Sequence, residues 1–282
     1  GARLRPARAP APRPRHPLDE AERLVTAPVL EAIGVTYSYP GRTPTRALDG
    51  IDLEIGDNEF VALLGPVGCG KTTLLRIFAG FQIPATGTVR CRGEPIGGPG
   101  WQRGYVLQEE AIFPWMTVRE NLEFGLRAKN LDAPARRAIS DELLELIGLA
   151  AFESAYPKEL SAGMSKMVEV ARVLATDPAI LLLDEPFGAL DAQTRARMQD
   201  ALSRLWERRK KTVVFVTHDA EEALYLADRI LVFSPRPGRL QAQFAVDLPR
   251  PRTVETRFSP RFLALKRQIW DATASAARAA AR

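Results

Sequence analysis

The chain has 282 residues, of which 46% are hydrophobic and 26% charged, and its formal net charge is +5. This composition excludes a wholly disordered, collagen-like or coiled-coil protein. No apolar run approaches the ~18–20 residues that a membrane-spanning helix needs. The cysteines Cys69 and Cys91 provide neither a disulfide framework nor the spacing of a zinc site, so we expect a reducing, cytosolic setting.

Residues 1–28 are expected to form a disordered extension rich in proline and arginine. Prolines and like charges favour an extended chain, and the segment lacks the apolar core of a secretory signal peptide. Its first 18 residues hold no acid and carry the whole net charge on Arg3, Arg5, Arg8, Arg13 and Arg15. A nucleic-acid binder places its basic excess on the folded body, so we expect no nucleic-acid partner. We expect the extension to be either solvated, with no fixed role, or in weak contact with anionic lipid or nucleic acid.

Short apolar runs then alternate with helical patterns. We predict strands at residues 29–37, 51–55, 60–64, 86–90, 180–183, 212–217 and 230–233, and helices at 71–79, about 198–206 and 221–227. Strands that alternate with helices predict an α/β fold with a parallel sheet and crossover helices.

A mostly helical stretch interrupts this alternation at about residues 110–176, and we predict that it is an inserted subdomain. Thr117 and Glu120 form a capping box at the start of one of its helices. Pro249–Arg252 marks a boundary, after which residues 251–282 are expected to form a helical tail. Its end, Ala272–Arg282, is expected to be a frayed helix or disordered.

The strongest chemical signal is a complete G-x-x-x-x-G-K-[ST] motif between the strand at 60–64 and the helix at 71–79. In this context the backbone amides wrap phosphate oxygens, and the helix N-terminus adds positive potential. Lys71 supplies charge to the β- and γ-phosphates, and the Thr72 hydroxyl can bind Mg²⁺. The predicted nucleotide-binding residues here are Gly65, Pro66, Val67, Gly68, Cys69, Gly70, Lys71, Thr72 and Thr73.

Two further strands end in polar residues at the carboxyl edge of the predicted sheet, where open α/β sheets bind ligands. Asp184 follows one strand and can hold Mg²⁺, while Glu185 is placed to polarise an attacking water. His218 follows the other strand and can hydrogen-bond the γ-phosphate and orient that water. The alternatives are two surface acids and a structural histidine, and the phosphate-binding loop disfavours both.

Four more motifs occur in the order seen in ATP-binding cassette (ABC) ATPases, which the chain resembles over about residues 29–250. They are Leu160-Ser-Ala-Gly-Met164, Gln108 after Tyr105-Val-Leu, Gly188-Ala-Leu-Asp191, and Thr217-His-Asp219. Gly98-Pro-Gly100, Phe113-Pro-Trp115, Ser234-Pro-Arg-Pro-Gly238 and Leu248-Pro-Arg-Pro-Arg252 are similar to the nitrate, sulfonate and taurine importer branch. The resemblance implies a P-loop NTPase (RecA-like) parallel core, an antiparallel β edge subdomain and the helical insert.

The resemblance also implies residue roles. Tyr39 stacks on adenine, with Tyr37 as the competing candidate. Gln108 contacts Mg²⁺ and the water, so Glu185, His218 and Gln108 form the expected catalytic set. The implied metal ligands are Thr72, Gln108 and Asp184. Ser161 and Gly163 reach the γ-phosphate bound by the opposite subunit, and Asp191 communicates across the dimer.

Three positions depart from the family pattern. Ala162 replaces a usual glycine, Ser165-Lys166-Met167 replaces an Arg-Gln-Arg-like run, and Val67 replaces a common serine. Gly163 and the loop amides remain, so we expect hydrolysis to survive.

The resemblance implies an ATP-hydrolysing subunit of a bacterial importer for a small anionic solute, at the cytoplasmic face of the inner membrane. Its implied partners are a second copy in a head-to-tail homodimer, a separate transmembrane permease, and a solute-binding protein outside the membrane. The segment Ala111–Val118 is expected to dock on the permease, the alternative being a buried loop with Pro114 and Trp115 in the core. Rival functions are a permease-free ATPase of DNA repair or translation and a non-hydrolysing regulatory module.

Overall fold

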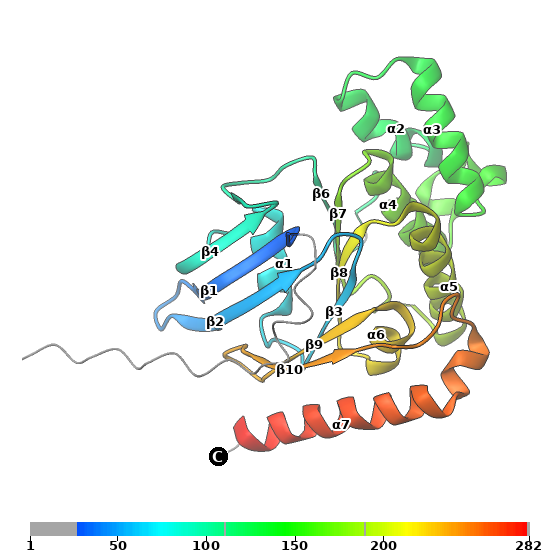
Figure 1. Cartoon of the computed structure of the whole chain (residues 1–282). Helices are drawn as coiled ribbons and strands as arrows, with labels where there is room; N and C mark the ends of the chain where they lie inside the picture. The colour runs from blue at the N-terminus through cyan, green and yellow to red at the C-terminus, as the bar shows by residue number, and fades with distance from the viewer. Residues whose placement is uncertain (1–26, 110, 189, 281–282) are drawn as a thin grey trace, which may run out of the picture.

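A six-stranded sheet forms the centre of the protein in a computed structural model that describes residues 27–109, 111–188 and 190–280 (Figure 1). Its strand order is β10-β9-β3-β8-β7-β6, and all neighbours are parallel except β10, which runs antiparallel to β9. The strands are β3 (Phe60–Leu64), β6 (Arg103–Val106), β7 (Ile180–Asp184), β8 (Thr212–Thr217), β9 (Arg229–Phe233) and β10 (Leu240–Ala245). The predicted extension lies outside the described residues except for its last two.

Both faces of this sheet are covered, which explains why β3, β7 and β8 are buried at every residue. Alternate side chains of β3 enter two different hydrophobic cores: Phe60, Ala62 and Leu64 face one, and Val61 and Leu63 face the other. The first core includes side chains of α4 (Ala162–Ala175), α5 (Ala192–Arg209), α6 (Ala220–Leu226) and α7 (Pro260–Ala280). The second core includes side chains of α1 (Lys71–Ala79) and of a second sheet.

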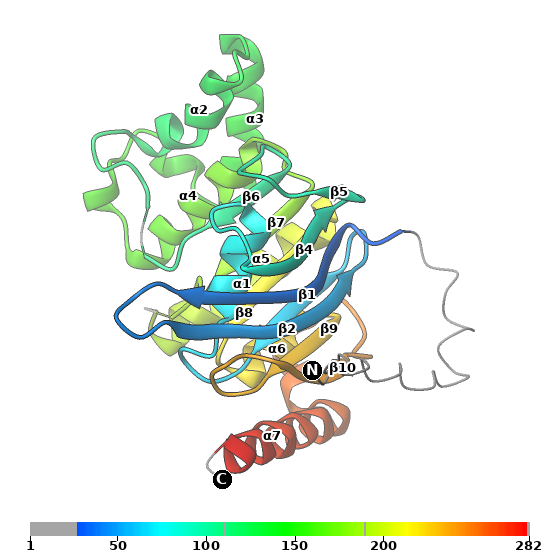
Figure 2. The same ribbon diagram turned by 90° about the vertical axis from the view of Figure 1, so that its left-hand side faces the viewer.

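The second sheet is antiparallel, as predicted, with strand order β2-β1-β4-β5 (Figure 2). Its strands are β1 (Leu30–Tyr39), β2 (Thr45–Ile55), β4 (Thr86–Cys91) and β5 (Glu94–Pro95). Leu30, Leu48 and Ile51 are fully buried in the core shared with α1. This packing brings the end of β1 beside the start of α1.

The inserted segment is helical and projects from the end of the sheet, as Figure 1 shows. Its elements are α2 (Val118–Ala128), α3 (Ala133–Leu146), the 3₁₀ turns η2 (Ala150–Phe152) and η3 (Pro157–Glu159), and α4. The capping box of Thr117 and Glu120 is confirmed at the start of α2. Helix α4 packs on α2 and also contacts β6, so it joins the insert to the central sheet.

The sequence did not predict β6 or β10. Strand β6 has only four residues, and a β10 pattern that alternates between half-buried and exposed residues carries a weak signal. At the other end, α7 extends as a helix to Ala280 after the turn η4 (Val254–Phe258). Its Phe262, Leu265 and Ile269 are buried in the main core. No helix in the described part of the chain has the length and apolarity needed to cross a bilayer.

Candidate nucleotide-binding and hydrolysis site

Four adjacent strands deliver the predicted site residues to one edge of the central sheet. Strand β3 leads into the phosphate-binding loop, β8 ends before His218, β7 ends with Asp184 before Glu185, and β6 ends shortly before Gln108. These strands are consecutive in the order β3-β8-β7-β6 and parallel, so their carboxyl ends lie together.

The phosphate-binding loop is held in a wrapped conformation around Lys71. Gly70 precedes α1 with φ of 104°, and a Cβ there would lie 2.6 Å from the carbonyl oxygen of Ala47. Only glycine therefore fits at this position. Lys71 is buried, and its Nζ donates to the carbonyl oxygens of Gly65 (2.7 Å) and Pro66 (3.0 Å). The ammonium group and the N-terminus of α1 together make an anion site.

Cys69 of the same loop is buried, and burial raises the pKa of its thiol. A protonated thiol is a poor nucleophile. The buried thiol of Cys69 therefore has a packing role, and its amide donates to the carbonyl oxygen of Pro66 within the loop.

A pocket of about 300 Å³ opens in front of this loop. Tyr39 lines it from the end of β1 and exchanges a 2.9 Å hydrogen bond with the Thr73 hydroxyl. Tyr37 instead packs against the second core and meets the Tyr39 ring edge-on at 5.1 Å between centroids. Of the two candidates, Tyr39 is the one that faces the pocket. The other lining residues are Ala47, Val67, Gly68, Gly70, Lys71, Thr72, Thr73, Gln108, Glu185 and Arg236.

Asp184 is buried and receives two hydrogen bonds, one on each carboxylate oxygen. Thr72 Oγ1 donates to Oδ1 at 2.8 Å, and the Tyr105 hydroxyl donates to Oδ2 at 2.8 Å. Burial, together with the charge of Asp184, raises the pKa of Tyr105, which therefore remains a neutral donor. Hydroxyl and carboxylate oxygens are the hard ligands that Mg²⁺ prefers, so Thr72 and Asp184 fit that ion.

Glu185 is the point at which the three predicted catalytic side chains meet. Its Oε2 lies 3.4 Å from His218 Nδ1 and 3.5 Å from Gln108 Nε2. Its φ is +42°, a strained conformation for a non-glycine residue, and its amide donates to the carbonyl oxygen of Val216 in β8. Strain of this kind concentrates at functional sites, where the surrounding structure maintains it.

Three predicted residues lie elsewhere in the described structure and do not line this pocket. Ser161 caps α4, and its hydroxyl accepts a hydrogen bond from the amide of Met164. Gly163 is buried, whereas Ala162 beside it is exposed. Asp191 caps α5, where hydrogen bonds from Thr194 lower the pKa of its carboxyl group.

Arg236 lines the pocket although we did not predict a role for it. Its Nε donates to the carbonyl oxygen of Gly68 at 3.1 Å. The residue belongs to the loop between β9 and β10, which reaches the phosphate-binding loop because β9 pairs with β3. No local sequence signal reports such a contact between residues far apart in the chain.

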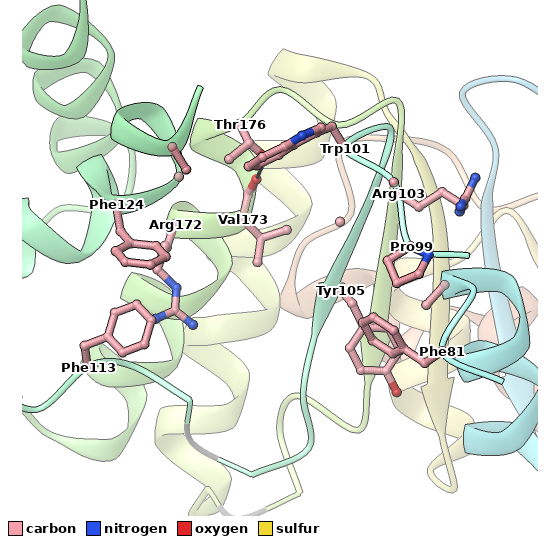
Figure 3. A pocket seen from close by; sticks show the side chains of 15 residues that line it. Phe81, Pro99, Trp101, Arg103, Tyr105, Phe113, Phe124, Arg172, Val173 and Thr176 are labelled. Carbon is pink, nitrogen blue, oxygen red and sulfur yellow. Dashed lines mark hydrogen bonds between the residues drawn. The ribbon is translucent and has the colours of Figure 1, made fainter. Parts of the chain in front are cut away.

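A second pocket, of about 500 Å³, lies between β6 and the helical insert (Figure 3). Figure 3 shows Phe81 and Tyr105 on the sheet side and Phe113, Phe124 and Arg172 on the helical side. The Arg172 guanidinium lies 4.7 Å from the centre of the Phe113 ring.

The neighbouring residues Pro114 and Trp115 are both exposed, and Trp115 retains 69% of its accessible surface. The alternative prediction of a buried loop with these two residues in the core is therefore wrong. Trp115 instead packs its ring against that of Phe113, a residue that lines the pocket of Figure 3, with 5.5 Å between the ring centroids.

Comparisons with known proteins agree with this geometry. Residues 48–188 match a family model described as ABC transporter. A putative ATP-binding protein of Brucella abortus is 50% identical over 80% of this chain and 87% of its own length. The aliphatic sulfonates import ATP-binding protein of Bacillus licheniformis is 45% identical over 81% of this chain and 88% of its own. The nitrate import ATP-binding protein of a Synechocystis species is 43% identical over 85% and 93%.

Among solved structures, an ATP-binding cassette captured as a dimer in a post-hydrolysis state with ADP and Pi is similar to this chain. The TM-score is 0.68 and the identity 31%, over 77% of this chain and 98% of the other. These comparisons confirm the predicted family and fold class.

Proposed function

Because this chain belongs to the ABC transporter family and is an ATPase, we propose that it supplies the energy of a membrane importer for a small anionic solute. The support is the identity to proteins named for the import of aliphatic sulfonates and of nitrate. The observation that carries the hydrolytic part is the meeting of His218 and Gln108 at one carboxylate oxygen of Glu185, in front of the phosphate-binding loop.

We propose the following roles for the residues of the site during hydrolysis. Lys71 exchanges its bonds to loop carbonyls for bonds to phosphate oxygens, which places its charge where negative charge develops. Tyr39 offers its ring to the base, a contact typically worth ~1–3 kcal/mol that tolerates different bases. Glu185 accepts a proton from the attacking water, and His218 and Gln108 hold that water and the γ-phosphate in line.

Mg²⁺ belongs to this proposal as the ion that neutralises the phosphate charge when it is bound. Thr72, Asp184 and the side-chain oxygen of Gln108 would hold it. The hydroxyl of Tyr105 keeps one Asp184 oxygen oriented, and the other oxygen lies 2.8 Å from Thr72 Oγ1, the second ligand proposed here.

A head-to-tail homodimer is the second part of the proposal. Ser161, Gly163 and Asp191 lie at the starts of α4 and α5 and do not line the pocket of their own chain, and in the proposed dimer they serve the nucleotide bound by the other copy. The hydroxyl of Ser161 stands at the N-terminus of α4, which is an anion-binding position. The related cassette that was solved as a dimer supports this arrangement.

The third part is docking of a transmembrane permease at the pocket of Figure 3, which would place the chain at the cytoplasmic face of the membrane. Trp101 and Phe124 line this pocket and expose large apolar surfaces, as does Trp115, whose ring packs on the lining residue Phe113. Exposed apolar patches of this kind mark interaction sites. A solute-binding protein outside the membrane would deliver the solute to that permease.

The test is the variant Glu185→Gln, assayed for ATP binding and turnover. We expect unchanged ATP affinity, an ATP-stabilised dimer and a turnover lower by ~10²–10⁴-fold, the usual contribution of a general base. Glu54→Gln, at an exposed position of β2, is the matched control and should turn over normally. Near-normal turnover of Glu185→Gln would remove Glu185 from the reaction, and an inactive wild-type chain would favour the regulatory module.

A further inference from the structure

Helix α4, which begins at the signature motif, carries a buried ion pair between Lys166 and Glu169. Lys166 belongs to the run that departs from the family pattern, and the sequence assigned no role to Glu169. Lys166 and Glu169 are 7% and 1% exposed, and Lys166 Nζ lies 2.7 Å from Glu169 Oε2. Burying two charges is costly unless other hydrogen bonds satisfy their remaining donors and acceptors. The other hydrogen-bond partners of Lys166 and Glu169 therefore show which segment of the chain the pair fixes in place.

Those partners are the backbone on both sides of Gln108. Lys166 Nζ donates to the carbonyl oxygens of Leu107 (3.0 Å), Gln108 (3.5 Å) and Glu109 (3.5 Å). The second carboxylate oxygen of Glu169 accepts a hydrogen bond from the amide of Leu107 at 3.0 Å. One ion pair thus fixes the segment 107–109 to α4, in a loop that has no regular secondary structure of its own.

The same helix begins at Ser161, the residue proposed to reach a nucleotide on the partner chain. Farther along α4, Arg172 donates to the carbonyl oxygen of Ala111 at 2.7 Å and covers the Phe113 ring. Helix α4 therefore connects three places: the signature serine, the segment around Gln108, and the wall of the pocket in Figure 3. A rigid helix keeps these places at fixed separations.

We propose that the Lys166–Glu169 pair is a positioning element that sets the place of Gln108 at Glu185 and makes Gln108 and the signature serine move as one body. Neither residue of the pair lines the pocket in front of the phosphate-binding loop, so the pair acts through the backbone of residues 107–109. This proposal rests on the role of Gln108 proposed above. It explains why lysine suits position 166: of the three donors of an ammonium group, one serves Glu169, one serves Leu107, and the third is shared by the two carbonyl oxygens at 3.5 Å.

The main test variant replaces both charges, Lys166→Met with Glu169→Leu. Removing one partner would leave an unpaired buried charge, whereas replacing a buried pair with apolar side chains of similar volume is often neutral for stability. This double variant therefore removes the bonds to residues 107–109 while the fold persists. ATP hydrolysis is measured for the wild-type full chain, the double variant, Gln108→Ala, and all three substitutions together.

We expect the double variant to lose about tenfold in kcat with KM changed less than about twofold, because misplacing a positioned group by ~1 Å can cost up to ~100-fold in rate. When the two substitutions are added to Gln108→Ala, kcat should fall no further than in Gln108→Ala alone. An unchanged kcat in the double variant, or losses that multiply with Gln108→Ala, would overturn the proposal.

A control variant separates positioning from a general loss of stability. Arg119→Gln breaks the contacts of Arg119 with Asp141 and Glu153 inside the helical insert, away from residues 107–109. It should lower the thermal midpoint and leave kcat near the wild-type value. An equal loss of kcat in this control would assign the effect to stability and refute the inference.

Hydrogen exchange at the Leu107 amide tests the attachment independently of turnover. If Gln108→Ala alone leaves kcat unchanged, the role proposed for Gln108 fails, and this readout still decides whether the ion pair holds the segment. We expect faster exchange at Leu107 in the double variant, by about tenfold or more, and wild-type exchange in Arg119→Gln. Unchanged exchange in the double variant would show that the pair does not fix the loop.

Discussion

Gly163 is the contact point between the signature helix α4 and the helix α5 that begins at Asp191. A Cβ placed on Gly163 would lie 2.5 Å from Thr194 Cγ2 and 3.6 Å from Met198 Sδ. The first distance is far below van der Waals contact, so Gly163→Ala forces α4 and α5 apart or changes the Thr194 rotamer. The Thr194 hydroxyl bonds to Asp191, so a rotamer change also disturbs the cap of α5.

The magnitude follows from two opposing effects. Inserting a methyl into a packed interface costs typically ~1–3 kcal/mol. Replacing a helical glycine with alanine returns about 1 kcal/mol through helix propensity. Because an approach of 2.5 Å places the cost in the upper part of that range, at about 2–3 kcal/mol, we expect Gly163→Ala to destabilise the protein by a net of about 1–2 kcal/mol. In a chain of this size that lowers the thermal midpoint by several degrees.

Thermal and urea unfolding of four proteins checks this value: wild type, Gly163→Ala, Thr194→Ser, and both substitutions together. Serine keeps the hydroxyl of Thr194 and removes the obstructing Cγ2, so the combined variant should recover most of the loss. Gly97→Ala is the control, because nothing lies within 4 Å of a Cβ there. If Thr194→Ser restores no stability to Gly163→Ala, the cost does not arise from this contact and the reasoning fails.

Three further predictions concern binding, pH and the signature motif. Tyr39→Ala should weaken ATP binding by ~1–3 kcal/mol in a fluorescent-nucleotide titration, and Tyr37→Ala by clearly less; equal losses would contradict the assignment of Tyr39. Burial raises the pKa of Glu222, so the folded state binds its proton more tightly, and this group's contribution to stability falls as pH rises above the ordinary value of 4.5. Glu222→Gln should remove that slope in urea midpoints measured across pH, and an unchanged slope would rule Glu222 out. Ala162→Gly should raise turnover by several-fold because the Ala162 methyl is exposed at the start of α4, whereas Ser161→Ala should lower it; two silent variants would mean that this segment is not a working signature motif.

Local signals were sufficient to predict the α/β class and the strand at 60–64 that carries the phosphate-binding loop, because buried strands are continuously apolar and the loop motif lies between a strand and a helix. The capping box at Thr117 is equally local. The antiparallel edge sheet was implied only by the family resemblance. The short strand β6 was missed because four residues that include an arginine and a glycine give little periodicity.

The polar contacts around the site could not be predicted in the same way. Tyr105 meets Asp184 across 79 positions of sequence, and Lys166 meets Leu107 across 59. Such contacts depend on which strands become neighbours and on how α4 packs against β6. A motif therefore identifies the site residues, but their hydrogen-bond partners depend on the strand order. No single strand carries the information for that order.

The C-terminal helix α7 has a practical consequence for anyone who shortens or tags this protein. Arg252 is 5% exposed, and its guanidinium donates to the carbonyl oxygens of Leu224, Tyr225 and Ala227 near the end of α6. A chain cut at residue 250 would lose these hydrogen bonds to α6. It would also lose Phe262 and Ile269 from the main core, and the burial of each such side chain contributes about 1.5–3 kcal/mol to the free energy of unfolding. A chain that ends at residue 250 should therefore aggregate on expression because part of its core is exposed, whereas a chain that retains α7 keeps that core covered.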